Sequence, residues 1–195
     1  MATSSLVIPS VDNCLKLMAQ YHMLPNIREH SIVVARVAEI ITSGLISAGH
    51  DLSLETVIAG ALLHDIGKTS CLDNNDDHAV KGVEICLSHH LEAVADIVAE
   101  HVILKNYLPG NGFSEKEIVY YSDKRVNHNQ VVSLEERLAY ILARYGKNNR
   151  IRCQAIRENY DLCQDLEKRM FSELPFNPDD ISGLLVKQPS KLILP

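Results

Sequence analysis

A histidine–aspartate pair lies at the centre of the chemistry that this sequence could carry out. His64 and Asp65 belong to segment 62–68, with the sequence LLHDIGK, which indicates the end of an apolar helix that stops at Gly67. A neutral imidazole beside a carboxylate suits a divalent transition metal. Lys68 adds a cation that could hold a phosphate oxygen. The segment therefore predicts a metal site that acts on a phosphorylated molecule.

Other ionisable residues fall on the apolar faces of predicted helices. Side chains three or four residues apart share a helix face, and by this spacing His30, His101 and Asp123 lie on apolar stripes, as His64 and Asp65 do. A single inward histidine usually bonds to a backbone carbonyl. Aspartate, however, is almost never fully buried unless it is paired or bound to a cation. Three inward histidines and two inward aspartates, with no Lys or Arg on these stripes, therefore predict a bound metal.

The types of these ligands indicate which metals fit the site. Imidazole and carboxylate ligands suit Mn, Fe, Zn, Ni or Co better than Mg or Ca, and the lack of a thiolate disfavours a structural zinc site. His78 is a weaker candidate on spacing alone, because it stands at a predicted helix start and could equally be a surface residue. With His78 included, the set is large enough for two metals that share Asp65. The other histidines are expected to face solvent: His22, His50, His89, His90 and His128.

Helices must position these residues, because the pattern is helical nearly throughout. Pairs such as Asn26 with Glu29 and Ser114 with Glu117 have the spacing of capping boxes. Strand-like alternation does not persist anywhere. We predict an all-α fold, a compact bundle of roughly eight to nine helices. The predicted helices span residues 11–23, 26–48, 53–67, 78–89, 91–102, 114–126, 133–146 and 150–174, with a short turn after 177.

Composition narrows the class of protein. The chain has 195 residues, 46% of them hydrophobic, and a net charge of −6, so we expect a globular chain that does not bind extended nucleic acid. Five scattered cysteines without a C-x-x-C pair indicate reduced thiols and a cytoplasmic location. We expect no transmembrane helix, because no run of about 18 apolar residues occurs, and no secretory signal at the N-terminus.

The candidate residues, taken in order, resemble the HD superfamily of metal-dependent phosphohydrolases. The resemblance covers about residues 26–147 and implies an HD-domain bundle, with an N-terminal helix at 1–25 packed on it and a helical extension and tail at 148–195. It implies that a core metal is held by His30, His64, Asp65 and Asp123. It also implies that His78 and His101 hold a second metal in the binuclear subset.

The expected reaction is hydrolysis of a phosphate ester or phosphoanhydride of a small substrate, such as a nucleotide or dinucleotide. One metal, or two about 3.5–4 Å apart, would activate water, with Asp65 as bridge and proton acceptor. Lys68 and Lys124 are the candidate phosphate ligands, whereas Lys105 and Arg125 are expected to be solvated surface charges. Loops 72–77 and 107–113 are expected to flank the site. The sequence is most similar to small stand-alone HD hydrolases, including the type that splits diadenosine tetraphosphate, and lacks the G-Y-P signature of cyclic dinucleotide phosphodiesterases.

Two other functions remain open from the sequence. One is a catalytically silent binding or signalling module on the same fold, although such modules typically lack the metal ligands. The other is a metal that only stabilises the fold. The charged helix at 150–174 could be a packing helix or a homodimer contact, and the tail at 187–195 could dock on the body or on a neighbour.

Overall fold

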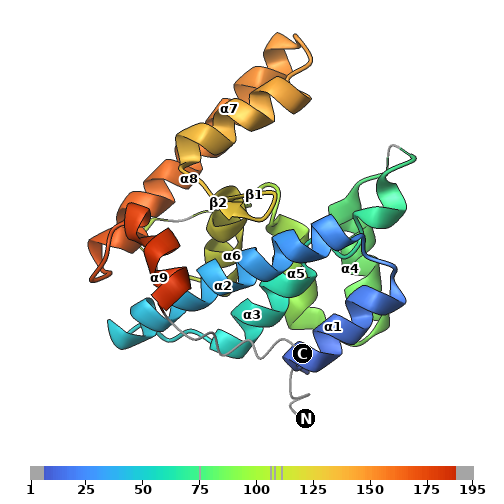
Figure 1. Cartoon of the computed structure of the whole chain (residues 1–195), viewed down its shortest axis with the longest axis horizontal. Coiled ribbons are helices and arrows are strands. Elements are labelled where there is room, and N and C mark those ends of the chain that lie inside the picture. Colours follow the sequence, from blue (N-terminus) through green and yellow to red (C-terminus); the bar gives the residue numbers. More distant parts are fainter. Residues whose placement is uncertain (1–6, 75, 106, 108, 111, 188–195) are drawn as a thin grey trace.

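The chain folds into a bundle of helices around one long central helix. The computed structural model describes residues 7–187 except 75, 106, 108 and 111 (Figure 1). Nine α-helices occur in this part of the chain: α1 (Val11–Gln20), α2 (Pro25–Ser47), α3 (Leu54–Leu63), α4 (His78–Ser88), α5 (Glu92–Glu100), α6 (Glu115–Lys124), α7 (Leu134–Tyr145), α8 (Arg150–Ser172) and α9 (Ile181–Lys187). Two 3₁₀ turns, Thr69–Cys71 and Pro178–Asp180, and one hairpin complete the fold. The predicted all-α class is confirmed.

Helix α2 is the central element, and it packs against α3, α6 and α9. It buries Val34, Ala38 and Ile41 completely. By length and hydropathy alone this helix could cross a membrane, although no transmembrane helix was expected. However, 61% of its most apolar 18-residue stretch is buried inside the protein. That burial is what the core helix of a folded domain shows.

Helix starts follow the predicted caps with one exception. The Ser53 hydroxyl accepts from the Thr56 N–H, and Ser114 and Ser133 each form a full capping box. The capping box predicted at Asn26 is wrong. Helix α2 begins one residue earlier, at Pro25, without a side-chain cap. Proline suits this first position, because its fixed φ is helical and its missing N–H would have no partner there.

A two-residue hairpin that the sequence analysis did not predict follows α6. Strands β1 (Val126–Asn127) and β2 (Gln130–Val131) pair antiparallel, and His128 in the turn has a φ of 55°. The hairpin ends α6 at Lys124, two residues before the predicted end. Strands this short are too brief for an alternating pattern to appear in the sequence.

Helices α7 and α8 form an arm that leaves the body of the bundle and returns to it. Figure 1 shows the two helices side by side, with the connection between them far from α3. The second half of α8 buries Tyr160, Cys163 and Leu166 against the core. The Tyr120 hydroxyl of α6 donates to the Asn159 carbonyl oxygen at 2.7 Å. Helix α8 is therefore an integral part of the bundle.

Arg125 joins the arm to the body, and the expectation that it is a solvated charge is wrong. Its side chain is only 3% exposed. Its guanidinium donates to Glu167 of α8 at 2.9 Å, to the Tyr121 hydroxyl at 2.7 Å and to the Val132 and Pro178 carbonyls. The charge is therefore shielded from water, but each guanidinium nitrogen donates to an acceptor, and these hydrogen bonds offset the cost of burial.

We predict that Arg125→Met destabilises the fold by about 3 kcal/mol, because it removes the cationic partner of Glu167 and leaves the Val132 and Pro178 carbonyls without their donor. Urea titration of the free energy of unfolding measures the effect. Arg157→Met is the matched control, since Arg157 is exposed on the same helix as Glu167 and should change stability by less than about 0.5 kcal/mol. Equal stabilities of the two variants would contradict the role of Arg125.

The five cysteines divide into two classes that a thiol reagent can distinguish. Cys14, Cys86 and Cys163 are buried, and burial raises the pKa of each to about 12. Cys71 and Cys153 are partly exposed. Because the thiolate is the reactive form, we predict that Ellman's reagent at pH 8 modifies Cys71 and Cys153 in the native protein and the other three only after unfolding. Rapid reaction of all five thiols without unfolding would contradict this packing.

Candidate metal centre

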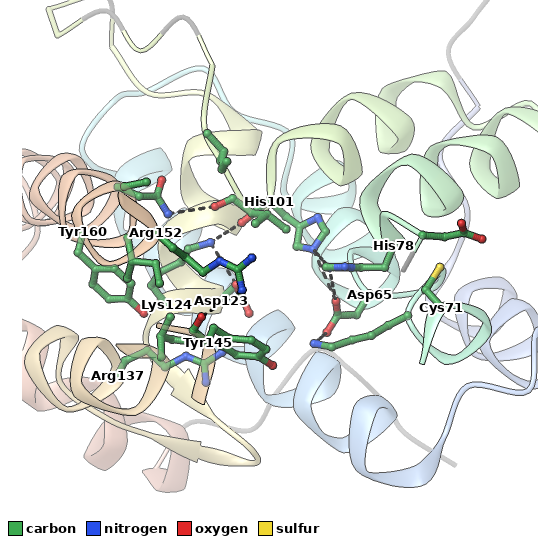
Figure 2. A pocket seen from close by; sticks show the side chains of 18 of the residues that line it. Asp65, Cys71, His78, His101, Asp123, Lys124, Arg137, Tyr145, Arg152 and Tyr160 are labelled. Carbon is green, nitrogen blue, oxygen red and sulfur yellow. Dashed lines mark hydrogen bonds and ion pairs between the residues drawn. The ribbon is translucent and has the colours of Figure 1, made fainter. Parts of the chain in front are cut away.

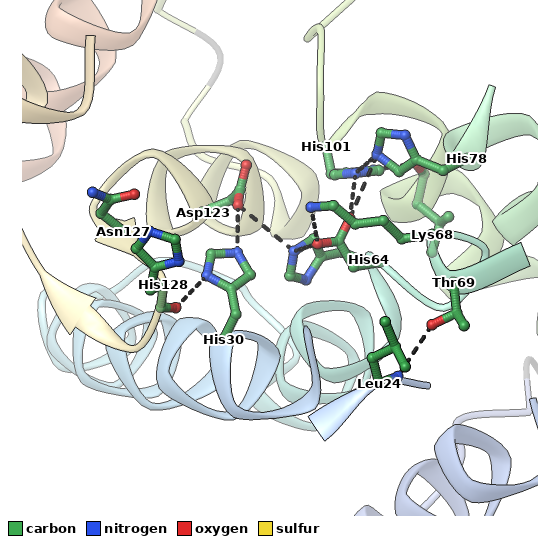
Figure 3. Close-up of polar contacts among 12 residues, drawn as sticks. Leu24, His30, His64, Lys68, Thr69, His78, His101, Asp123, Asn127 and His128 are labelled. Atoms are coloured by element: carbon green, nitrogen blue, oxygen red, sulfur yellow. Dashed lines mark hydrogen bonds and ion pairs between the residues drawn. The ribbon is translucent and has the colours of Figure 1, made fainter. Parts of the chain in front are cut away.

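Residues from five helices meet at one point beside α2. His64 and His101 are the residues that end α3 and α5, and His78 is the first residue of α4. Asp123 lies in the last turn of α6, and His30 projects from the first half of α2. Figure 3 shows these side chains pointing toward one another. All six residues predicted as metal ligands, with Asp65 directly after His64, are therefore brought together.

Three of the histidine rings are held through the same atom, Nδ1, by backbone carbonyls. The Nδ1 atom lies 2.7 Å from the Ala61 oxygen in His64, 2.7 Å from the Val98 oxygen in His101 and 2.8 Å from the His128 oxygen in His30. A carbonyl can only accept, so Nδ1 carries the proton and Nε2 of the neutral ring offers a lone pair. Fixing the ring through its other nitrogen is the arrangement that metal-binding histidines use.

The first group of ligand atoms contains His30, His64, Asp65 and Asp123. The His64 Nε2 atom lies 3.5 Å from Asp65 Oδ2 and 3.6 Å from Asp123 Oδ1, and His30 Nε2 lies 2.9 Å from the same Asp123 oxygen. The His64 side chain is fully buried, yet its Nε2 atom has no hydrogen-bond partner. An orphaned buried acceptor beside two carboxylates fits a cation at this point.

The second group contains Asp65, His78 and His101. The Nε2 atoms of His78 and His101 each lie 3.5 Å from Asp65 Oδ1 and 3.1 Å from each other. Burial lowers the pKa of His78 to about 4, even though Asp65 opposes this shift, so the ring is neutral at neutral pH. Burial likewise lowers the pKa of His101. Two neutral imidazoles facing one carboxylate oxygen form a second donor set.

Asp65 links the two groups through its two oxygens. Its Oδ2 atom faces His64 and its Oδ1 atom faces His78 and His101. The three donors of each set, His30–His64–Asp65 and Asp65–His78–His101, lie within 4.8 Å of one another. One carboxylate therefore offers one oxygen to each of two cation positions, and the donor types fit divalent transition metals.

The carboxylates of the centre remain ionised despite their burial. Burial would raise the pKa of Asp65, but His64 and Lys68 outweigh it and hold that pKa well below its usual range. Burial would also raise the pKa of Asp123, but Lys124 and His30 outweigh it and hold that pKa well below its usual range. The pKa of His64 is raised, because Asp65 and Asp123 overcome the lowering effect of its burial. Each carboxylate has one lysine beside it, but neither lysine reaches the His64 Nε2 atom, which stays without a partner.

The two lysines predicted as phosphate ligands occupy different places. Lys68 Nζ lies 2.7 Å from Asp65 Oδ2, and its side chain is 35% exposed at the cavity. Lys124 is 6% exposed, donates to the His101 carbonyl and contacts Asp123 at 3.2 Å. Lys68 can therefore reach a bound molecule with little rearrangement, whereas Lys124 also holds the end of α5 against α6. Both lysines line the cavity.

A cavity of about 570 Å³ opens onto the centre (Figure 2). Asp65, His78, His101 and Asp123 line it. Leu72 and Asp76 from the predicted flanking loop 72–77 also line it. In the described part of loop 107–113, Tyr107 and Gly112 instead contact Asp165 and Arg169 of α8. That loop supports the arm.

The chain matches the family model described as HD domain over residues 27–174. The chain belongs to the HD-domain family. The match continues through α8, which the sequence analysis placed outside the resemblance. The HD family consists in general of metal-dependent hydrolases, and the clusters described above could hold such a metal.

Individual relatives of this HD protein are distant. It is 28% identical over 144 residues to a protein named tRNA (cytidine(56)-2′-O)-methyltransferase from Picrophilus torridus, which covers 66% of this chain and 40% of the relative. A protein of the same name from Thermoplasma volcanium is 28% identical over 79% of this chain and 42% of its own length. An uncharacterized Methanocaldococcus jannaschii protein is 26% identical over 64% of this chain and 80% of its own. No solved structure matches.

The arm supplies cavity residues that the sequence analysis missed. They come from α7 and α8: Arg137, Ile141, Tyr145, Arg152, Ala155, Ile156, Asn159 and Tyr160. The signal was present in the sequence, because residues 137, 141 and 145 are spaced four apart and so share one face of α7. The side chains of the other histidines lie outside both ligand groups, although the backbone carbonyl of His128 holds His30. His90 and His128 are exposed, while His89 and His50 bond to Tyr21 and Glu173.

Gly67 allows α4 to approach the HD motif closely. A Cβ atom at this position would lie 2.6 Å from the Gly82 backbone nitrogen and would also overlap the His78 carbonyl oxygen. Backbone atoms cannot turn aside as a flexible side chain can. The glycine therefore sets the distance between Asp65 and His78.

We predict that Gly67→Ala destabilises the protein by about 1–3 kcal/mol, because α4 must move away to make room. Gly183→Ala is the control, since an added Cβ meets no atom within 4 Å there, and alanine favours the helix. Thermal unfolding of both variants measures the difference. A Gly67→Ala protein as stable as wild type would contradict the close approach of α4.

Proposed function

We propose that this HD protein hydrolyses a phosphate ester or phosphoanhydride bond of a small substrate, in the class of nucleotides or dinucleotides. One observation carries the proposal. The buried Nε2 atom of His64 has no hydrogen-bond partner and faces two ionised carboxylates beside an open cavity. This arrangement is costly unless a cation is bound, and a cation beside a cavity can act on a substrate.

The six ligand residues would hold one or two divalent transition metals, of Mn, Fe, Ni, Co or Zn. His30, His64 and Asp123 would serve one position, His78 and His101 the other, and Asp65 both. A metal held there lowers the pKa of water and neutralises charge on phosphoryl oxygens. Asp65, placed between the two donor sets, would accept the proton of the attacking water, and Lys68 can hold a phosphate oxygen next to it.

An open centre supports catalysis over a purely structural metal. The His78 side chain is 28% exposed and that of Asp123 14% exposed, and both line the cavity. A structural site is usually closed by protein ligands on every side. A silent binding module on the HD fold would not need the full set of six ligand residues that this chain retains.

The cavity supports a substrate with an organic part. Ile103, Ile141 and Ile156 line it together with the ionisable residues. Apolar walls with a few charged groups are typical of sites for nucleotide-sized molecules. The net charge of −6 disfavours extended nucleic acid. Because this chain spans only 40% and 42% of the two named methyltransferases, methyl transfer is not proposed for it.

We predict that Asp65→Asn lowers hydrolysis of bis(p-nitrophenyl) phosphate and of nucleotides by at least about 100-fold and reduces bound metal, because the amide cannot supply an anionic bridge. Asp76→Asn is the control, since Asp76 lines the same cavity but belongs to neither ligand group. Manganese-loaded proteins purified without chelator are assayed for activity and for metal content.

Full activity of the Asp65→Asn protein would contradict the assignment. If the wild type binds metal but hydrolyses no phosphate ester, nucleotide or dinucleotide, the protein is a binding module. If chelation unfolds the wild type and no activity is found at any metal loading, the metal is structural.

A further inference from the structure

We propose that Arg137 and Arg152 form a second anion-binding subsite, which holds a non-scissile phosphate of a substrate that carries two phosphoryl groups. This inference rests on the proposed hydrolysis, because it assigns the first phosphate to the HD centre. It adds a specificity that the HD motif itself does not contain, since both arginines come from the α7–α8 arm.

The two arginines face the metal centre from the opposite side of the cavity. Arg137 lies on α7 and Arg152 lies in the first turn of α8. Figure 2 shows both side chains on the side of the arm, across from Asp65 and His78. All four residues line the same cavity. A molecule in this space contacts both walls at once.

Neither guanidinium has an acidic partner among the described residues. Arg137 Nη1 donates to the Asn127 side-chain oxygen at 2.9 Å, and its buried Nε has no hydrogen-bond partner. Arg152 makes only a long contact of 3.4 Å with the Tyr145 carbonyl oxygen. By contrast, the buried Arg125 pairs with Glu167. Because neither guanidinium is paired with any of the carboxylates that line the cavity, both have donors left for an anion.

The surrounding residues favour a phosphate of an organic molecule over a free ion. Ile141 lies one helical turn after Arg137, and Ile156 one turn after Arg152, so each arginine shares a cavity-facing helix face with an isoleucine. Tyr145 continues the face of α7 and lines the same cavity as Lys68. The arm therefore reaches the HD motif, and the apolar residues occupy the same wall as the arginines.

These features define the substrate class. Guanidinium groups bind phosphate through pairs of parallel hydrogen bonds. A monoester with one phosphate needs only the HD centre and Lys68. A nucleoside bisphosphate, or another molecule with two separate phosphates, would use both sites. Hydrolysis remains the addition of water to the scissile phosphorus with loss of one P–O bond.

The test compares two substrates with manganese-loaded full-length protein. We expect Arg137→Gln and Arg152→Gln each to raise the KM for adenosine 3′,5′-bisphosphate by about tenfold or more, since each removes a charge-assisted contact. The KM for p-nitrophenyl phosphate, which has one phosphate, should change less than about twofold. Arg157→Gln, an exposed arginine of α8 outside the cavity, should change neither value. Circular dichroism and thermal unfolding confirm that the variants are folded.

Equal changes for both substrates, or no change for either, would overturn the subsite. If the wild type hydrolyses neither compound, the proposed function is at fault, and the subsite is then tested by equilibrium dialysis with adenosine 3′,5′-bisphosphate. Weaker binding by the two variants than by Arg157→Gln would support the subsite on its own. Equal binding would overturn it. Arg137→Lys serves as a second variant at that position, because it keeps the charge if Arg137→Gln fails to fold.

Discussion

The arrangement of buried negative charge and neutral imidazoles around Asp65 is the constraint on which the rest of the structure depends. Asp65 is buried and Asp123 is largely buried, and the Nε2 atoms of four histidine rings face their oxygens. Lys68 and Lys124 balance part of the charge from the edge of the cluster. Neither lysine contacts the His64 Nε2 atom, which is left without a partner. A divalent cation satisfies this atom and the carboxylates together.

The fold brings these candidate ligands to one place from distant parts of the chain. Helices α3 and α5 each end in a histidine whose ring bonds to the carbonyl one turn earlier, so the helix end itself orients the ligand. The short hairpin after α6 has the corresponding role for His30, because it supplies the His128 carbonyl. Gly67 then lets α4 come close enough for His78 to join. Rigid backbone groups therefore set the geometry of the centre.

The α7–α8 arm completes the cavity at the candidate metal centre. It adds an apolar and cationic wall on the side that the helices of the HD motif leave open. Its attachment depends on groups next to the ligands, since Arg125 follows Asp123 and Lys124 in the chain and binds Glu167 of α8. Movement of the arm would therefore displace the end of α6, where Asp123 lies. This connection places the arm's wall of the cavity and the candidate metal ligands in one packed unit.

Much of the site could be predicted from the sequence, for a physical reason. Buried aspartates and histidines interrupt the apolar period of a helix, so His30, Asp65, His101 and Asp123 stand out in the sequence. His78 is the first residue of a helix and does not interrupt an apolar stripe. Only the family resemblance placed it firmly among the ligands. The hairpin was too short to leave a pattern. The burial of Arg125 depends on Glu167, 42 residues away. A contact between residues so far apart leaves no periodic pattern in the local sequence.

The location of the metal can be measured directly by anomalous diffraction from crystals soaked in manganese. The account predicts anomalous peaks between His64 and Asp123, between His78 and His101, or at both positions, with Asp65 beside each peak. Metal found only at other residues, or an ordered centre without a peak under saturating manganese, would contradict it.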